Sequence, residues 1–307
     1  MADDLSERLV DALNATYGRH PGHRAAHAKG VLCAATFTAT SEAAGLSIAP
    51  HFDGTPHRAH VRFSNGSGDP ASVDGARDGR GIALKVYLPA GGTTDVIGLT
   101  LPVFFVRTPE DLLAFNDARR PDPDTGALDM DKVGAFLAEH PETVPAVTAA
   151  ITAPTPASYA QLRYHALHTF RFLAPDGAVR HGRYRFEPAA GEASISEDDV
   201  AGRSPDYLRE ELGERLARGP ASFALDLEIA DAGDPLDDPT AAWPEDRTRV
   251  RIAQIEITAL AFDREHDGDV LVFDPSRVPH GIELSDDPIL RARSGAYGVS
   301  VTRRTAG

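Results

Sequence analysis

The stretch His168–Glu187, HTFRFLAPDGAVRHGRYRFE, decides the fold class. Within it, His168–Leu173 and Ala178–Glu187 are rich in aromatic and β-branched residues, and Pro175-Asp176-Gly177 separates them. Two such runs around a short turn sequence predict an antiparallel β-hairpin. At least one antiparallel strand pair is therefore expected in the middle of the chain.

Strand-like and helix-like segments alternate on both sides of this hairpin. Further strands are predicted at Val31–Thr40, Ala59–Phe63, Gly81–Leu88, Val103–Arg107, Phe223–Ile229 and 249–263. Helices are predicted over 5–17, 109–119 after a Thr108 cap, 130–152 with a break at Pro141, and from Ser204-Pro205-Asp206 to Gly219, with a long loop over 231–247. Many short strands with inserted helices predict an α+β fold built on a closed antiparallel barrel of about eight strands.

The bulk composition limits the classes of partner. The chain has 307 residues and a formal net charge of −15, which disfavours nucleic acids and anionic membranes as partners. The N-terminal segment lacks the pattern of a secretory signal, and no apolar run approaches the roughly 20 residues of a membrane span, so we expect a cytoplasmic protein. Cys33 is the one cysteine, and its apolar surroundings predict a small core residue rather than a nucleophile.

Two motifs in the first quarter of the chain contain candidate functional residues. In Arg24-Ala-Ala-His27-Ala-Lys-Gly30, His27 is a candidate general acid–base, because imidazole exchanges protons near neutral pH. In Val61-Arg62-Phe63-Ser64, Arg62 alternates with apolar residues and is expected on the opposite face of its strand. An arginine that pointed into a barrel would need an anionic partner. From these residues alone, surface or core roles stay open for both side chains.

A third motif lies near the C-terminus. Ser285-Asp286-Asp287-Pro288 is a typical helix start, and Arg293 and Tyr297 follow at a spacing that places them on one helix face. A cation beside a phenol favours the phenolate, which is a strong ligand for ferric iron. A tyrosine that simply packs under an arginine is the alternative.

Six segments, in order along the chain, resemble the motifs of haem catalases. HAKG resembles the segment that contains the catalytic histidine of that family, and VRFS, RDGRGIALKVY, LPVFFVR and FDPSRVPHGIELSDD resemble further catalase segments. RSGAY, Arg293–Tyr297, falls where catalases have the Arg-x-x-x-Tyr motif that contains the iron ligand. The chain is identified as similar to the small catalase-related peroxidases, with residues 1–307 as one haem-binding domain. Neither the N-terminal arm nor the C-terminal flavodoxin-like domain of large catalases is expected.

The resemblance implies haem b, iron protoporphyrin IX, as the cofactor and gives each site residue a role. Tyr297 would bind the iron, and Arg293 would keep Tyr297 ionised. His27 would move a proton between the two oxygens of the peroxide, and Ser64 would form a hydrogen bond that orients His27. The remaining haem contacts implied by the resemblance are Arg24, Arg62 and Arg304 at the propionates and Phe104 at the ring.

Three departures from the catalase pattern affect the expected activity. Leu99 stands where catalases have an asparagine that hydrogen-bonds the peroxide, and Leu112 replaces a phenylalanine that packs on the haem. Ala26 replaces a valine that narrows the access channel, which implies a wider channel here. Because leucine cannot hydrogen-bond, oxidation of a second peroxide should suffer more than reaction with the first.

These departures favour a peroxidase that uses hydrogen peroxide or an organic hydroperoxide to oxidise a small organic reductant, with weak catalase activity. Four alternatives stay open: a true catalase, a hydroperoxide isomerase or lyase of the allene oxide synthase type, a haem carrier or sensor, and a barrel that binds no haem. Loss of the N-terminal arm favours a monomer or homodimer over an interlocked tetramer.

Overall fold

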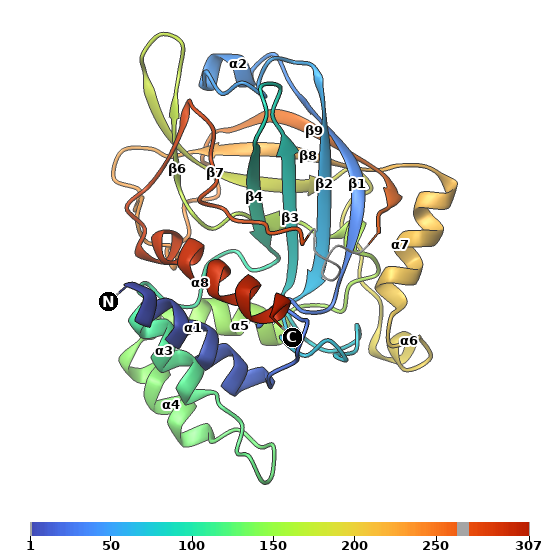
Figure 1. Ribbon diagram of the computed structural model, residues 1–307, viewed down its shortest axis with the longest axis vertical. Helices are drawn as coiled ribbons and strands as arrows, with labels where there is room; N and C mark the ends of the chain where they lie inside the picture. The colour runs from blue at the N-terminus through green and yellow to red at the C-terminus, as the bar shows by residue number, and fades with distance from the viewer. Residues whose placement is uncertain (1, 263–269, 307) are drawn as a thin grey trace.

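Eight antiparallel strands close into a barrel in the computed structural model, which describes residues 2–262 and 270–306 (Figure 1). The neighbour order is β7-β5-β4-β3-β2-β1-β9-β8, and pairing of β8 with β7 closes the ring. β6 and β10 extend the sheet beyond β7. The strand bounds are β1 Gly30–Ala39, β2 Pro56–Asn65, β3 Arg80–Tyr87, β4 Thr93–Leu99, β5 Tyr164–His165, β6 Phe170–Leu173, β7 Val179–Pro188, β8 Ala221–Ile229, β9 Arg249–Leu260 and β10 Ile282–Leu284. The predicted barrel is confirmed.

The hairpin that decides the fold class forms as predicted. β6 and β7 pair antiparallel, with Phe170 opposite Gly182 and Leu173 opposite Val179. Gly177 supplies the positive φ of 83° that the turn requires. The Ala174 N–H donates to the Ala178 carbonyl, 2.9 Å away, and closes the loop.

Alternate side chains of the strands fill the barrel. Val61 and Phe63 of β2 are fully buried, and Phe63 packs against Tyr159, Tyr164 and Phe223 with ring centroids 5.4–6.1 Å apart across the cluster. Inward and outward side chains alternate along a strand, so Arg62 lies on the outer face.

Cys33 of β1 is also fully buried, and burial raises the pKa of its thiol to about 12. A thiol with such a pKa stays protonated near neutral pH, which confirms its prediction as a core residue rather than a nucleophile.

The predicted strand at Val103–Arg107 is wrong, because the segment has no strand pairing. Val106 is buried against Phe115 and Phe136 of two helices, and the Phe104 N–H donates to a loop carbonyl, that of Pro239, at 2.8 Å. The apolar residues of Val103–Arg107 are explained by packing against helices and not by pairing in the sheet.

β4 lies outside the predicted strands. It contains Asp95 and Gly98, residue types that strands disfavour. Asp95 is tolerated there because it pairs with Lys85 at 2.5 Å and with Arg277 at 2.7 Å. Residue 263, the end of the predicted strand 249–263, lies outside the described residues.

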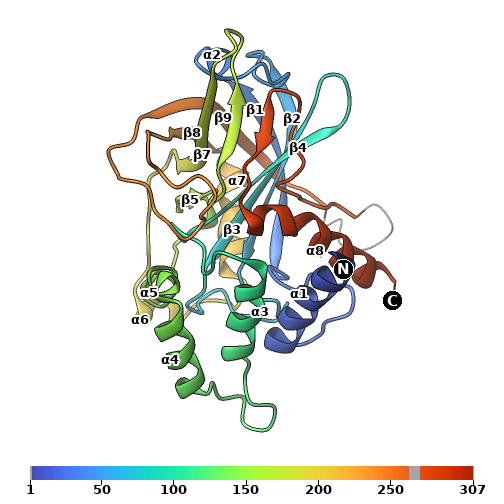
Figure 2. The ribbon, with the colours of Figure 1, turned by 90° about the vertical axis from the view of Figure 1, so that its left-hand side faces the viewer.

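Helices cover one end of the barrel, with α1, α3, α4, α5 and α8 grouped together and α6 and α7 on another side (Figures 1 and 2). The bounds are α1 Ala2–Tyr17, α2 Ala43–Leu46, α3 Pro109–Ala118, α4 Met130–Glu139, α5 Val144–Thr152, α6 Glu197–Ala201, α7 Tyr207–Arg218 and α8 Pro288–Thr305, with 3₁₀ turns at η1 Pro141–Thr143 and η2 Tyr159–Gln161. The predicted helices, including the break at Pro141 and the end at Gly219, are confirmed. In the part of the chain that the structure describes, none of the helices combines the length and apolar character that crossing a membrane requires.

Side-chain caps explain where α3 and α8 begin. Thr108 accepts a hydrogen bond from the Asp111 N–H at the start of α3. Asp287 accepts from the N–H groups of Ile289 and Leu290 at the start of α8, where Pro288 occupies the first position. α8 then packs along α1, and its Arg303 pairs with Asp11 at 2.5 Å.

Candidate active site

One row of residues crosses the outer face of the barrel at the ends of its strands. The register pairs Gly30 with Ser64, Ser64 with Gly81, Gly81 with Leu99, and Leu99 with His165. Residues directly opposite one another on paired strands share a face, so Ser64 and Leu99 lie on the same wall with only Gly81 between them.

His27 lies over this wall and is held in an unusual backbone conformation. Its φ is 55°, and it is the one described residue other than glycine with a positive φ. Its Nδ1 lies 3.0 Å from the Ser64 Oγ, and its N–H donates to the Gly66 carbonyl at 3.1 Å. A strained residue held by several bonds is a frequent mark of a functional site.

Gly81 supplies the space that the His27–Ser64 pair needs. A Cβ atom at position 81 would lie 2.8 Å from the Ser64 Oγ and 3.0 Å from the His27 Nδ1. The first distance is too short for a carbon atom and the second is tight, so a larger residue would force the Ser64 hydroxyl to move and would crowd the imidazole. Glycine at this position is therefore part of the site.

Arg62 binds the backbone of the segment that contains His27. Its Nη1 donates to the His27 carbonyl at 3.0 Å and its Nη2 to the Ala28 carbonyl at 3.1 Å. The side chain is buried, as an arginine needing partners should be, but on the outer face of the barrel rather than in its interior. The prediction that it lies opposite Val61 and Phe63 is confirmed, whereas an arginine pointing into the barrel is not observed.

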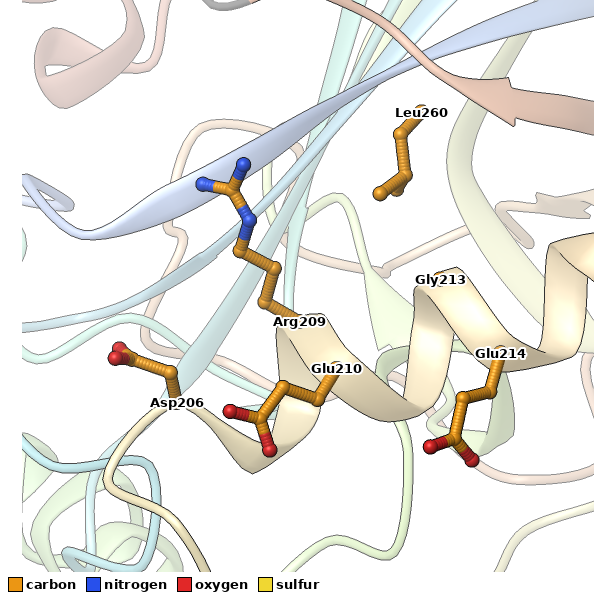
Figure 3. Close-up of a pocket in the computed structure, with 6 residues that line it drawn as sticks. All are labelled: Asp206, Arg209, Glu210, Gly213, Glu214 and Leu260. Atoms are coloured by element: carbon orange, nitrogen blue, oxygen red, sulfur yellow. The ribbon is translucent and has the colours of Figure 1, made fainter.

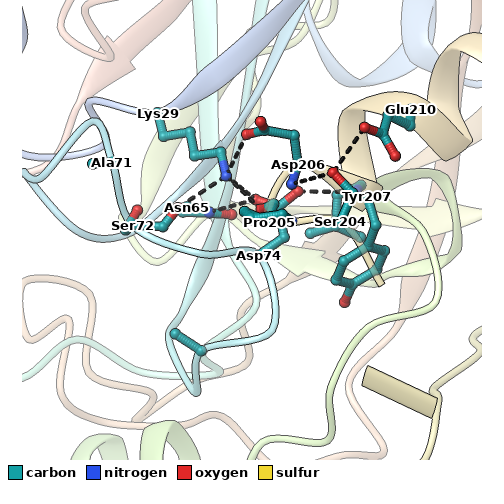
Figure 4. Close-up of polar contacts among 12 residues, drawn as sticks. Lys29, Asn65, Ala71, Ser72, Asp74, Ser204, Pro205, Asp206, Tyr207 and Glu210 are labelled. Carbon is teal, nitrogen blue, oxygen red and sulfur yellow. Dashed lines mark hydrogen bonds and ion pairs between the residues drawn. The ribbon is translucent and has the colours of Figure 1, made fainter. Parts of the chain in front are cut away.

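Lys29 anchors the other end of the same segment to the start of α7. Its Nζ lies 2.9 Å from the buried Asp74 and 2.7 Å from Asp206, and it donates to two backbone carbonyls (Figure 4). Asp74 also accepts hydrogen bonds from Asn65 and from the Leu208 N–H. The segment that contains His27 is thus fixed on both sides by charged side chains.

The surroundings of His27 set its protonation. Burial lowers its pKa to about 4, with the nearby Arg62 and Arg293 acting in the same direction and Asp78 opposing them. The imidazole is therefore neutral near pH 7 and able to accept a proton.

A second group of polar residues joins α8 to the barrel. Arg293 donates through Nη2 to the Tyr297 hydroxyl, as the i, i+4 spacing predicts, and its Nη1 lies 3.0 Å from the His168 Nε2. The His168 Nδ1 lies 2.6 Å from the Asp287 carboxylate. Tyr297, Arg293, His168 and Asp287 thus form one hydrogen-bonded chain from the helix to the sheet.

The tautomer of His168 follows from its partners. Arg293 can only donate, so the His168 Nε2 must accept, and Nδ1 must hold the proton that Asp287 accepts. Burial lowers the pKa of His168, against the opposing effect of Asp287, and this agrees with a neutral ring. The sequence predicts a helix start at Asp287 but no further role for it, and no role for His168. The Ser-Asp-Asp-Pro signal pointed to the cap, and no signal pointed to the pairing.

The remaining predicted site residues lie around these two groups. Arg24 is half-buried and donates to the Leu271 carbonyl at 2.9 Å. Phe104 has its ring centroid 6.4 Å from that of His168. Arg304 lies in the last turn of α8 and is buried. Hydrogen bonds connect His27 with Ser64 and Arg62, and Arg293 with Tyr297.

The residues present fit a haem group. The strand positions two residues beyond the Ser64 row share its face, and there the apolar Leu32, Ala83 and Ile97 stand in one row with Arg62. Leu271 and Phe273 complete this buried cluster. An apolar cluster beside a neutral histidine suits one face of a porphyrin, and a phenol oxygen held by an arginine is the ligand type known for catalase iron.

A separate surface groove contains none of these residues. It has a volume of about 650 Å³ and is lined by Asp206, Arg209, Glu210, Gly213, Glu214 and Leu260. Figure 3 shows the three acidic side chains along α7 with Leu260 across the groove. Because His27, Ser64 and Tyr297 lie elsewhere, this groove is not the candidate active site.

Known proteins of similar sequence and fold are catalases and catalase-related peroxidases. A family model described as Catalase matches residues 8–307. The catalase-related peroxidase of Mycolicibacterium paratuberculosis is 44% identical over 97% of this chain and 94% of its own, and that of Synechococcus elongatus is 33% identical over 98% and 89%. The crystal structure of a fungal catalase superposes with a TM-score of 0.83 at 27% identity over 93% of this chain. The match spans 59% of that larger catalase.

The Asp287→Asn substitution tests the hydrogen-bonded chain. Asparagine still caps α8, but its amide cannot accept from the His168 Nδ1 while its oxygen caps the helix. We expect the free energy of unfolding to fall by about 1–3 kcal/mol, because a buried donor loses its partner.

Chemical denaturation of the wild type and of Asp287→Asn measures this fall in the free energy of unfolding. Asp286→Asn is the matched control, since Asp286 is the exposed neighbour and pairs with Arg291 at the surface. Equal stability of Asp287→Asn and Asp286→Asn would show that the hydrogen bond between His168 and Asp287 contributes nothing to the free energy of unfolding.

Proposed function

This chain belongs to the catalase family, and from that premise we propose that it is a haem-dependent peroxidase with weak catalase activity. The observation that carries the proposal is the row in which Ser64, Gly81 and Leu99 stand side by side beneath His27. Ser64 in this row is the partner of the neutral His27. Leu99 in the same row is an apolar side chain where catalases have a hydrogen-bond donor.

The proposed cofactor is haem b. Tyr297 would bind the iron through its phenol oxygen, and Arg24, Arg62 and Arg304 would pair with the propionates. Phe104 would pack at the ring near His168. When bound, haem supplies the iron chemistry that accepts oxidising equivalents from peroxide and passes them to a donor.

His27 performs the proton transfer in this proposal. Its neutral imidazole accepts a proton from one oxygen of the peroxide and returns it to the other as the O–O bond breaks. The hydrogen bond between the His27 Nδ1 and the Ser64 Oγ and the bonds from Arg62 to the His27 segment hold the ring in the required orientation. A ring that needs no reorganisation costs the reaction little entropy.

Leu99 explains the preference for an organic donor. Its side chain cannot hydrogen-bond, so a second peroxide molecule is not oriented for oxidation. Reaction with the first peroxide depends mainly on His27 and is retained. A small organic reductant then takes the place of the second peroxide.

Several finer properties belong to the same proposal. The 1–307 chain acts as a single haem-binding domain, as a monomer or homodimer, in the cytoplasm. Its net charge of −15 supports a small-molecule donor over nucleic acid or an anionic membrane surface as partner.

The His27→Gln substitution tests the proton-transfer role. The substitution keeps a polar side chain but removes the titrating ring, so we expect the rate of reaction with hydrogen peroxide to fall by about a hundredfold or more. In the wild type, the rate should stay constant from pH 8 to pH 6 and fall as the pH drops through about 4, because protonation removes the base. Stopped-flow mixing of holoenzyme with peroxide measures both.

His181→Gln serves as the control, since His181 lies on β7 away from the site. A wild-type rate in His27→Gln, or a midpoint near the ordinary histidine pKa, would contradict the role given to His27. Donor oxidation no faster than that by free haemin would contradict the peroxidase itself.

The Leu99→Asn substitution tests why catalase activity is weak. It restores a hydrogen-bond donor to the row, so we expect oxygen release from peroxide without any donor to rise by up to about a hundredfold. An oxygen electrode measures the release. Leu99→Ala is the matched control, because it opens the same space without adding a donor, and an equal rise in that variant would show that space rather than hydrogen bonding limits the reaction.

A further inference from the structure

A cluster of three side chains with the chemistry of metal ligands lies in the helical layer. Asp111 is in the first turn of α3, His140 ends α4, and Glu142 is in the 3₁₀ turn that follows. One ligand atom from each residue lies within 4.8 Å of the other two. The catalase resemblance and the proposed peroxidase chemistry use none of them.

The geometry matches the coordination sphere of a small divalent ion. The His140 Nδ1 lies 3.5 Å from the Glu142 Oε1. Two ligands at bond lengths of about 2.0–2.1 Å in a tetrahedral site are about 3.4 Å apart, so this pair needs almost no movement. The Asp111 carboxylate lies within 4.8 Å of both ligand atoms, so a movement of at most about 1.4 Å brings it to the same distance.

Packing fixes the ligands in place before any ion arrives. The His140 ring stacks on Phe136 with centroids 4.3 Å apart and an interplanar angle of 19°. Thr108 binds the Asp111 N–H at 3.1 Å and so fixes the first turn of α3. All three ligand residues are half-buried rather than freely solvated. Preorganised ligands lose little entropy on binding.

The charges in the cluster are unbalanced. Two carboxylates converge on one imidazole, and within 2–262 and 270–306 no lysine or arginine forms an ion pair with Asp111 or Glu142. Like charges held close together in a half-buried site raise the energy of the empty cluster. A divalent cation would remove that repulsion.

We propose that Asp111, His140 and Glu142 bind one divalent transition-metal ion, of which zinc is the best match. Zinc takes imidazole and carboxylate ligands in tetrahedral sites, and a water molecule completes a three-residue set. The ion crosslinks the start of α3 to the end of α4, which lie side by side (Figure 2). It therefore stabilises the helical layer in which Phe115 and Phe136 pack against Phe104.

Zinc binding to the chelator-treated holoenzyme tests the site, with Asp111→Asn and Glu142→Gln as the variants. Each variant keeps the side-chain shape and removes one charged ligand, so we expect the dissociation constant measured by calorimetry to rise about tenfold or more. Excess zinc should raise the melting temperature of the wild type by a few degrees and that of the variants by less.

Glu110→Gln is the matched control. Glu110 lies in the same helical turn, carries the same charge and is exposed, so its variant should bind zinc as the wild type does. The proposal is overturned if Asp111→Asn and Glu142→Gln bind zinc as tightly as Glu110→Gln, or if zinc does not bind the wild type. Peroxidase activity plays no part in either readout, so the haem chemistry and the metal site can be tested separately.

Discussion

The hydrogen bond between His168 and Asp287 is the interaction on which the two halves of the structure depend. His168 stands just before β6 of the hairpin that decides the fold class, and Asp287 starts α8, 119 residues later. One carboxylate oxygen caps the helix while the other accepts from the imidazole, so the same side chain sets where α8 begins and how it meets the barrel. The ring then accepts from Arg293, which in turn donates to Tyr297. The position of the Tyr297 phenol oxygen therefore depends on where the barrel places His168.

The opposite side of the site depends on a different constraint, the positive φ of His27. That conformation is costly for a residue with a side chain, and it persists because charged groups fix both ends of the segment. Arg62 holds the carbonyls of His27 and Ala28, while Lys29 is paired with Asp74 and Asp206. Arg62 and Asp74 are buried, so the strain is offset in part by bonds shielded from water. A neutral imidazole is presented to the site as a result.

The sequence predicts the features that are local and misses those that join distant segments. The turn at Pro175-Asp176-Gly177, the cap at Asp287 and the Arg293–Tyr297 pair each follow from a spacing of a few residues, and each is observed. Val103–Arg107 misleads because an apolar run reports burial without saying against what. The pairing of His168 with Asp287 and the convergence of Asp111 on His140 depend on how the elements pack. A single sequence contains no local signal for such contacts.

The central claim is that Tyr297 is the iron ligand of a haem enzyme, and the absorption spectrum tests it most directly. The protein expressed with ample haem should give a ferric, high-spin spectrum of the tyrosinate type, and Tyr297→Phe should lose or alter it. Tyr87→Phe, on the far part of β3, should leave the spectrum unchanged. A colourless wild-type protein, or a haem spectrum indifferent to Tyr297→Phe, would contradict the account.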